Sequence, residues 1–394
     1  MITRFTVKSF KSLESVTIDL GQVNVFIGAN GSGKSNLLEA MGVLGAAAFG
    51  RVDDESLLRR GVRPGLPQLY KSAFPNERVP AHIFFGAQNA KAKYEVSLWN
   101  PISDPKPGWR YKTETLFRDR RKLVGRSPAL KEKLNPEQGL AALQSVQFKP
   151  WDPELSLLSQ LRNFSIYCAN TPTLRGLVPE QQVREPVGLS GGRLPEAIRE
   201  IRGARLDNEW FRETFQEVLS LIDWAKNVDS AASASVPLSP SAAASQRVVR
   251  FTDRYMTKGR NALTGYDASE GALYILFAAV LALHPKSPEC FAIDNLDQAL
   301  NPRLAKRLAE YVCQWILNGK TQRQILITAH NPSVLDGLPL VDDRVRLFTV
   351  DRNNRGHTIV SRVELSENLR KMAENNWTLS RLWVMGHIGG VPNV

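Results

Sequence analysis

Cysteine is scarce in this sequence. Among 394 residues there are only three, Cys168, Cys290 and Cys313, which are odd in number and far apart. They therefore fit neither a disulfide framework nor a zinc site. Such usage is typical of a reducing compartment, and we expect a cytoplasmic protein.

Long apolar stretches are also missing. The first residues, Met1 to Phe5, lack the extended apolar region of a signal peptide. The longest apolar run, Gly271 to Leu283, is too short to span a bilayer and ends at His284-Pro285. The sequence predicts no membrane partner.

Acidic residues are outnumbered, with 39 Asp and Glu against 51 Lys and Arg, a net charge of +12. This balance favours an anionic partner. Residues 110–133 hold nine of the cations against three acidic residues, with aromatic residues nearby. They form either a patch for a nucleic-acid backbone or a solvated basic hairpin. The central cations are Arg118, Arg120, Arg121, Lys122 and Arg126.

The sequence does contain a phosphate-binding loop. Residues 28–35 follow the spacing Gly-x-x-x-x-Gly-Lys-Ser, after a buried strand at 23–27 and before a helix that opens at Asn36. In this context the loop N–H groups and the helix N-terminus converge on an anion. We expect a nucleoside triphosphate, with Lys34 at the β- and γ-phosphates and the Ser35 hydroxyl on Mg²⁺.

Other segments outline the organisation of the chain. Strands are predicted at 2–7 and 16–20 around a turn at 9–12, and again at 81–88 and 93–99. The Ser-, Ala- and Pro-rich stretch 230–245 cannot build a core, so we expect a mobile linker there. We divide the chain into an N-terminal ATPase part (1–60), an insertion (61–245) and a C-terminal ATPase part (246–394).

One family resemblance rests on the residues quoted next. The segment 8–13, Lys-Ser-Phe-Lys-Ser-Leu, followed by 25–37 with its phosphate loop, resembles the opening of the RecF/SMC/OLD-like group of ABC-type ATPases. The resemblance places Phe10 and Lys11 near the nucleotide, although an ordinary β-turn is the alternative. It implies ATP and Mg²⁺ as cofactors. The implied nucleotide-binding residues of the loop are Gly28, Asn30, Gly31, Ser32, Gly33, Lys34, Ser35 and Asn36.

A second motif resembles the Ser-x-Gly signature of the same ATPases. It lies in Asp267 to Leu273, at the start of an apolar helix. The resemblance implies that Ser269 and Gly271 complete the ATP site of an opposite subunit, so that a homodimer encloses two ATPs. An ordinary helix N-cap is the alternative. Leu-Ser-Gly-Gly at 189–192 has a similar wording, but its position in the chain argues against that role.

The strand 290–293 ends in Asp294, which matches the Walker B carboxylate and would share Mg²⁺ with Ser35. The family places a glutamate base next, but this chain has Asn295. A carboxamide can orient a water and cannot accept its proton, so hydrolysis should be slow. Alternatively, Asp297 or Glu270 takes over part of the role.

Residues 297–302 resemble the D-loop, and His330, at the end of a buried strand, resembles the switch histidine. The order of these motifs implies an α/β fold: a P-loop NTPase of the ABC-ATPase head type. Its mixed sheet, flanked by helices, would surround the phosphate-loop strand, with a compact insertion of strands and helices splitting the domain.

The process is less defined than the fold. Stand-alone ATPases that look like this often serve bacterial anti-phage systems, such as Septu or retron-associated systems, with a separate nuclease or toxin. The resemblance thus implies an ATP-gated sensor and scaffold. The alternative is a RecF-like DNA-repair ATPase that hydrolyses ATP on duplex DNA. A transport subunit is a weaker third, since no membrane-contact helix is identifiable.

Overall fold

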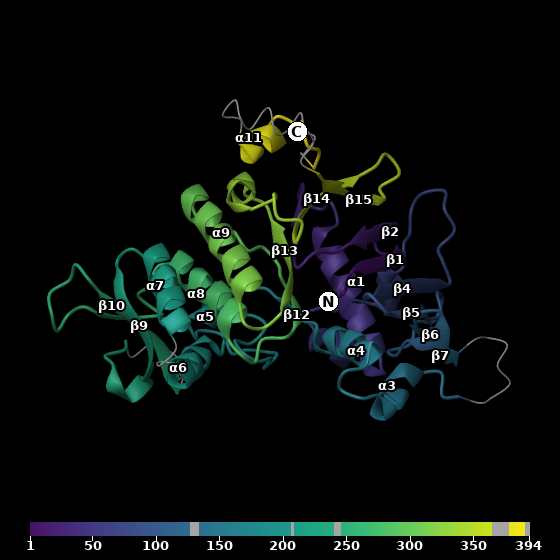
Figure 1. Ribbon diagram of the computed structural model, residues 1–394, viewed down its shortest axis with the longest axis horizontal. Helices are drawn as coiled ribbons and strands as arrows, with labels where there is room; N and C mark the ends of the chain where they lie inside the picture. Colours follow the sequence, from purple (N-terminus) through teal and green to yellow (C-terminus); the bar gives the residue numbers. More distant parts are fainter. Residues whose placement is uncertain (127–133, 206–208, 240–245, 365–377, 391–394) are drawn as a thin grey trace.

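A computed structural model describes the chain except for residues 127–133, 206–208, 240–245, 365–377 and 391–394. Two six-stranded sheets lie on either side of helix α1 (Lys34–Phe49). A group of helices with a small third sheet lies on the far side of the sheet that contains the phosphate-loop strand (Figure 1).

The central sheet is built around β3 (Val23–Ile27), the strand that leads into the phosphate loop. Its order is β15-β14-β3-β13-β12-β8, in which only β15 runs antiparallel to its neighbour. Parallel strands covered on both faces are apolar throughout, and β3, β12 and β13 are indeed wholly buried. The predicted mixed sheet is confirmed. The other strands are β8 (Ile166–Tyr167), β12 (Cys290–Ile293), β13 (Gln324–Ala329), β14 (Val345–Arg352) and β15 (Thr358–Val363).

The second sheet is antiparallel throughout, in the order β2-β1-β4-β5-β6-β7. Its strands alternate between buried and exposed residues, because one face packs on α1 and its neighbours. It contains the two expected hairpins, with bounds shifted by a few residues. The strands are β1 (Arg4–Phe10), β2 (Leu13–Asp19), β4 (His82–Gln88), β5 (Ala92–Trp99), β6 (Arg110–Arg118) and β7 (Arg121–Arg126).

Helix α1 is buried on nearly all sides, since it contacts strands of both sheets and the helix α4 (Pro153–Asn163). Its apolar residues share one core with β1 and with residues of β12 and β13. Two short helices, α2 (Asp54–Leu58) and α3 (Leu140–Gln144), lie near its C-terminal end, as does α4. A rigid, enclosed α1 therefore connects the phosphate loop to the opposite end of this lobe.

The helical side packs around α8 (Glu270–Leu283) and α9 (Pro302–Asn318). It also contains α5 (Thr171–Leu174), α6 (Leu194–Arg205), α7 (Glu209–Leu221) and the sheet β11-β10-β9. Near the C-terminus, α11 (Leu379–Val384) packs on the 3₁₀ helix η4 (Pro332–Gly337).

The mobile linker predicted at residues 230–245 is wrong for its first three residues. Residues 230–232 belong to β9 (Ala225–Ala232), which pairs with β10 (Arg247–Asp253), itself paired with β11 (Ala262–Thr264). A division of the chain at 245/246 would therefore separate two paired strands. Small residues such as Ala231 are tolerated here because a neighbouring strand and α6 cover them. Residues 240–245 lie outside the described part.

Candidate nucleotide site

The phosphate loop is held by a side chain of the central sheet, that of Thr358 in β15. Gly33 caps α1 with φ of 113°, and a Cβ there would lie 2.3 Å from Thr358 Oγ1, so only glycine fits. That Thr358 hydroxyl donates to the Ser32 carbonyl at 2.7 Å. The loop is thus fixed before any ligand binds.

Lys34 points back along the loop. Its Nζ donates to the carbonyls of Gly28 (2.6 Å) and Ala29 (2.9 Å), and the residue is only 5% exposed. Burial lowers the pKa of Lys34 to about 8, although the charges of Asp294 and Asp297 oppose that shift. No carboxylate in the described part of the chain forms an ion pair with it. An anion entering the loop would therefore supply the missing counter-charge.

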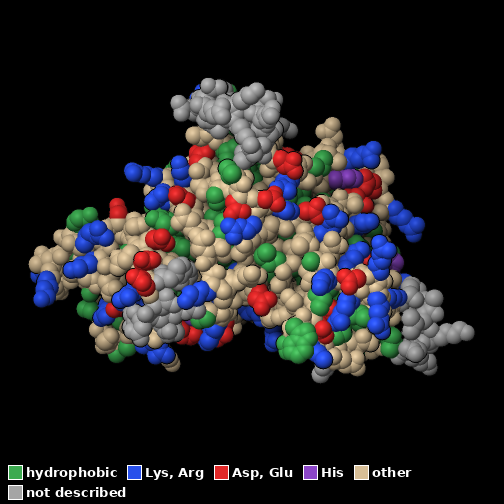
Figure 2. All heavy atoms as spheres, viewed as in Figure 1, with side chains coloured by type: hydrophobic (Ala, Val, Ile, Leu, Met, Phe, Trp, Pro, Cys, Tyr) green, Lys and Arg blue, Asp and Glu red, His purple; other side chains and the backbone are tan. Residues whose placement is uncertain are grey.

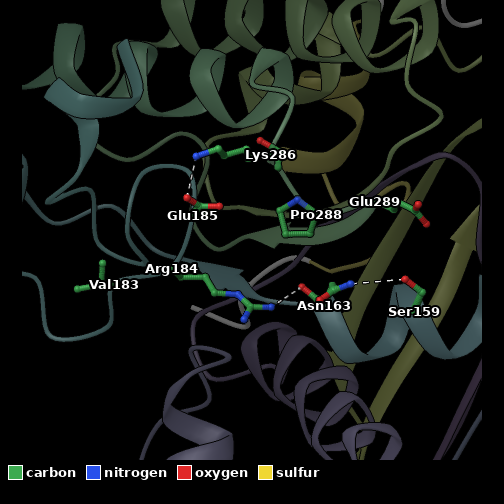
Figure 3. A pocket seen from close by; sticks show the side chains of 9 residues that line it. Ser159, Asn163, Val183, Arg184, Glu185, Lys286, Pro288 and Glu289 are labelled. Carbon is green, nitrogen blue, oxygen red and sulfur yellow. Dashed lines mark hydrogen bonds and ion pairs between the residues drawn. The ribbon is translucent and has the colours of Figure 1, made fainter. Parts of the chain in front are cut away.

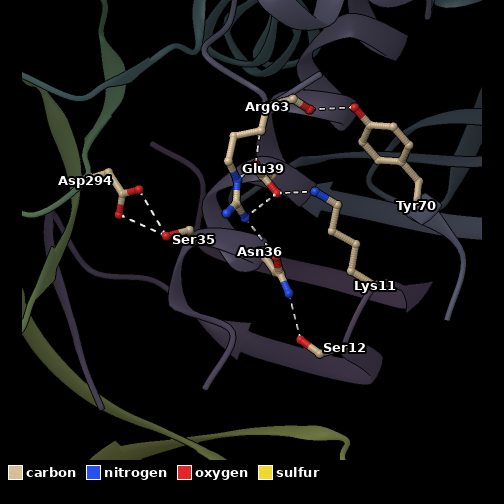
Figure 4. Close-up of polar contacts among 8 residues, drawn as sticks. All are labelled: Lys11, Ser12, Ser35, Asn36, Glu39, Arg63, Tyr70 and Asp294. Atoms are coloured by element: carbon tan, nitrogen blue, oxygen red, sulfur yellow. Dashed lines mark hydrogen bonds and ion pairs between the residues drawn. The ribbon is translucent and has the colours of Figure 1, made fainter. Parts of the chain in front are cut away.

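Three elements bring oxygen ligands together beside the loop. The Ser35 hydroxyl donates to Asp294 Oδ2 at 3.0 Å, and the Thr328 hydroxyl donates to Asp294 Oδ1. These residues stand at the start of α1 and at the ends of β12 and β13. Figure 4 shows Ser35 turned toward Asp294. A hydroxyl and a carboxylate are hard ligands that suit Mg²⁺, so the residues fit the ion that the sequence implies.

Asn295 is fixed in a left-handed backbone conformation with φ of 60°. Its N–H donates to Thr328 Oγ1 at 2.9 Å, and its side-chain Oδ1 lies 3.0 Å from His330 Nε2. Burial, followed by the charge of Lys34, lowers the pKa of His330. A neutral imidazole with its proton on Nε2 donates to the carboxamide oxygen. Asn295 and His330 therefore form one polar unit.

Asp297 contacts the backbone that carries this histidine. Its Oδ2 accepts the N–H groups of His330 (2.9 Å) and Asn331, and the residue is 8% exposed. The carboxylate thus positions the loop after β13. The other sequence-based candidate for a base, Glu270, accepts the Thr171 hydroxyl on the helical side instead.

A cavity of about 350 Å³ lies over these groups. Of the expected residues, Gly28, Ser32 and Asp294 do not line the cavity. They instead accept hydrogen bonds from Lys34, Thr358 and Ser35, respectively. Two cations that sequence reasoning missed, Arg63 and Arg352, also face it, and no motif could have indicated them. The lining consists of Asn30, Gly31, Gly33, Lys34, Ser35, Asn36, Arg63, Asn295, His330 and Arg352.

Arg63 belongs to a network centred on the buried carboxylate Glu39 in α1 (Figure 4). Glu39 accepts from Arg63 Nε at 2.6 Å and from Lys11 Nζ at 2.5 Å. Burial alone would raise the pKa of Glu39, but the bonds and charges of Arg63 and Lys11 hold it below its usual value. Arg63 also donates to Asn36 Oδ1, whose amide in turn donates to Ser12. The network orients one wall of the cavity.

Neither Lys11 nor Phe10 lines the nucleotide cavity, but Lys11 is connected to its wall through Glu39, which also binds Arg63. Phe10 is fully buried and packs against Tyr70 and Phe85, so the expectation for this side chain is wrong. In the turn at 9–12, Lys11 is thus bonded to Glu39 of α1, whereas its neighbour Phe10 belongs to the core.

The Ser-x-Gly segment lies apart from the cavity. Ser269 is exposed at the start of α8, and its hydroxyl accepts the Ala272 N–H at 3.4 Å. A Cβ on Gly271 would lie 3.2 Å from the Ala299 carbonyl, so the segment adjoins the loop that follows Asp294. Leu-Ser-Gly-Gly at 189–192 forms a turn before α6, where Glu180 accepts two of its N–H groups.

The basic stretch forms the hairpin β6–β7. Arg118 pairs with Asp152 at 3.1 Å and with buried Glu154, and Arg126 donates to the carbonyls of Asn135 and Gln138. Lys and Arg side chains are interspersed with acidic ones on this side of the molecule (Figure 2). The exposed cations of the cluster are Arg120, Arg121 and Lys122.

Within the described ranges, every helix is too short or too polar to cross a bilayer.

Comparisons with known proteins find similarity to AAA ATPase domains and to RecF. Residues 1–75 match a family model described as "AAA ATPase domain", and residues 198–336 match "AAA domain, putative AbiEii toxin, Type IV TA system". RecF, a DNA replication and repair protein of Rhodococcus erythropolis, is 28% identical over 156 residues, 39% of this chain and 30% of that protein. RecF of Colwellia psychrerythraea is 56% identical over 45 residues, 11% of this chain and 12% of that protein. The matches thus span less than a third of these relatives.

Among solved structures, an SMC head bound to the C-winged helix domain of ScpA superposes with a TM-score of 0.53. The alignment covers 94% of this chain and 99% of that chain at 13% identity, which shows a shared fold. With the phosphate loop, Asp294 and His330 assembled as described, the protein has an SMC-head-like P-loop ATPase fold and is similar to ABC-type ATPases of the RecF/SMC-like group.

Proposed function

We propose that this protein uses ATP to hold a complex together and hydrolyses it slowly to ADP and phosphate. The observation that carries the proposal is the bond between Asn295 and His330. The Asn295 carboxamide follows Asp294 directly, cannot accept a proton from water, and is held by His330. We assign Asp297 a positioning role, because it is only 8% exposed and its Oδ2 accepts two backbone N–H groups of the histidine loop.

The binding half of the site keeps the groups that grip a triphosphate. The loop N–H groups and Lys34 would hold the phosphates, and Ser35 with Asp294 would hold Mg²⁺, which screens phosphate charge when bound. Asn36, Arg63 and Arg352 would contact the remainder of the nucleotide from the cavity wall. Binding without efficient turnover favours a long-lived ATP state.

The working unit is a homodimer that encloses two ATPs. Ser269 supports this proposal, because it is exposed at the N-terminus of a 14-residue helix and does not line the cavity of its own subunit. A helix N-terminus that faces solvent can bind the γ-phosphate of a partner subunit's ATP.

The dimer would act as sensor and scaffold for a separate effector, a nuclease or toxin, in anti-phage defence. The match of residues 198–336 to a family described by a toxin–antitoxin system supports this role. The second candidate, DNA repair on duplex DNA, is favoured by the RecF relatives and by exposed Arg120, Arg121 and Lys122.

The test compares dimer mass and ATP turnover in the wild type and in Asn295→Glu. We expect ATP with Mg²⁺ to produce a stable dimer in the wild type with little phosphate release. Asn295→Glu should raise turnover by about 100-fold or more, because it restores a general base. Asn295→Gln is the matched control, with the length of glutamate and no carboxylate.

Rapid turnover by the wild type, stimulated by duplex DNA, would contradict the clamp and support the repair function. An ATP-loaded protein that stays monomeric in sedimentation would overturn the dimer.

A further inference from the structure

Five arginines converge on a second cavity, far from the phosphate loop. It has a volume of about 170 Å³ and lies where α1, α2 and α4 end. Its acidic residues, Asp53 and Glu55, are already paired, with Arg51 and Arg59, each at 2.6 Å. The cavity is lined by Phe49, Arg51, Asp53, Glu55, Ser56, Arg59, Arg60, Arg162, Asn163 and Arg184.

The other three arginines have no carboxylate partner among the described residues. Arg60 donates to the carbonyls of Ser56 and Arg162, and Arg162 donates to that of Ala48. Arg184 donates to the Asn163 carbonyl at 3.1 Å. Carbonyls at helix C-termini attract such cations, but they supply only partial charges against three full ones.

Arg60 makes the imbalance most evident. It is 4% exposed, and its Nε finds no hydrogen-bond acceptor in the part of the chain that the structure describes. Burial, and then the charge of Arg184, lowers its pKa to about 10. A buried charge without a counter-charge is unfavourable unless a ligand provides one. A phosphoryl group with several acceptor oxygens matches such a group of guanidinium donors.

A larger cavity of about 540 Å³ adjoins the first, since Asn163 and Arg184 line both. Figure 3 shows Arg184 turned toward Asn163, and Lys286 paired with Glu185 at 2.9 Å. Of its four charged residues, Glu185 and Lys286 pair with each other, whereas Arg184 and Glu289 form no ion pair among the described residues. Its hydroxyl and amide groups suit a neutral, polar molecule. Ser287, 7% exposed, lines it with an Oγ that lacks a partner in the described ranges.

We propose that these cavities bind a small phosphomonoester of nucleoside-monophosphate size. Its phosphoryl group would lie among Arg60, Arg162 and Arg184, and its neutral body in the larger cavity beside Ser287. A duplex does not fit, because its backbone phosphates cannot reach a guanidinium as buried as that of Arg60.

This site is separate from the nucleotide site and does not depend on its function. Lys34 begins α1 and Phe49 ends it, so the two sites stand at opposite ends of a 16-residue helix, about 24 Å apart at 1.5 Å per residue. A ligand at one end is therefore placed to influence the other through a single rigid element.

Calorimetric titration with 5′-AMP and with inorganic phosphate tests the proposal. The titrations use Lys34→Ala protein, so that the phosphate loop contributes little. We expect one equivalent of each probe to bind, and AMP about tenfold more tightly, because only AMP fills the larger cavity. Adding Arg184→Gln should raise the Kd of both probes at least tenfold. Arg184 is only partly buried, and an unchanged Tm will show that the variant folds.

Arg307→Gln in the same background is the matched control: it removes the same charge from an arginine on α9 that pairs with Glu310 and lines neither cavity. Its Kd should not change. Failure of both probes to bind, or equal Kd values in all variants, would overturn the site. Equal affinities for AMP and phosphate would overturn the assignment of the larger cavity. Displacement of AMP by duplex DNA would assign the guanidinium groups to nucleic acid and overturn the proposal.

Discussion

Helix α1 has a positively charged site at each end, and the two sites balance their charge in opposite ways. At its N-terminus a single ammonium, Lys34, lies on two loop carbonyls with Asp294 and Asp297 close enough to affect its pKa. At its C-terminus Arg60 and Arg184 stand together, with no carboxylate bound to either among the described residues.

The contrast shows how each end balances its charge before a ligand arrives. Lys34 can lose its proton at moderately basic pH, so its site tolerates being empty. Arginine keeps its proton at any ordinary pH, and Arg60 must therefore rely on carbonyls or on an anion. The N-terminal site suits a ligand that comes and goes, whereas the C-terminal site suits one that stays bound.

The largest expected effect is a loss of affinity for ATP at one end of α1 with no change in the affinity for AMP at the other. Lys34→Ala should raise the Kd for ATP by about 100-fold or more, because it removes the buried charge that faces the phosphates. The affinity of the arginine site for AMP should not change. Titration of a fluorescent ATP analogue measures the first effect and calorimetry the second.

Lys8→Ala, which removes an exposed lysine on β1, is the control and should leave both affinities unchanged. A parallel loss at both ends in Lys34→Ala would mean that the two sites are one cooperative unit, and the comparison would fail.

The same contrast explains how much could be read from the sequence. The loop at 28–35 is contiguous, and its spacing carries the mechanism, so its place beside Asp294 and His330 could be predicted. The mixed sheet followed from buried apolar strands around that loop. These predictions needed only local patterns and their order along the chain.

The arginine site could not be found in this way, because only the folded chain brings Arg60 and Arg162, which stand at helix ends, together with Arg184 from the loop between α5 and α6. Arg63 was missed for a similar reason: its position depends on Glu39, which looks like any helical glutamate. The strand at 230–232 was missed because small residues there pack under other elements, which composition does not show.

A pH titration sharpens the comparison with a smaller effect. The pKa of Lys34 is lowered to about 8, so its charge is lost as the pH rises through that value, and ATP binding must then restore the proton. Between pH 7.5 and 9 the affinity for ATP should fall roughly tenfold. The arginine site should bind AMP almost equally, because the pKa of Arg60 is about 10.

Lys34→Arg is the control for this titration, since arginine stays charged over the whole range. Calorimetry in buffers of different ionisation enthalpy should detect proton uptake in the wild type only. Affinities for ATP that do not vary with pH would show that Lys34 keeps its proton in the free protein.

The smallest effect concerns the middle of α1. Glu39→Gln should weaken ATP binding by roughly three- to tenfold, because Arg63 and Lys11 lose the charge that orients them, while no group at the phosphates changes. The site at the C-terminal end should keep its affinity for AMP. Kd values for both ligands, with Tm as a check on folding, measure the effect.

Asp19→Asn on β2 is the matched control, because Asp19 is exposed, lines neither site and pairs with Arg4 at the surface, where an ion pair contributes little. An unchanged Kd for ATP in Glu39→Gln would show that Arg63 does not contact the nucleotide. A loss of AMP binding in the same variant would show that α1 transmits changes along its length, and the two ends would then be coupled rather than merely connected.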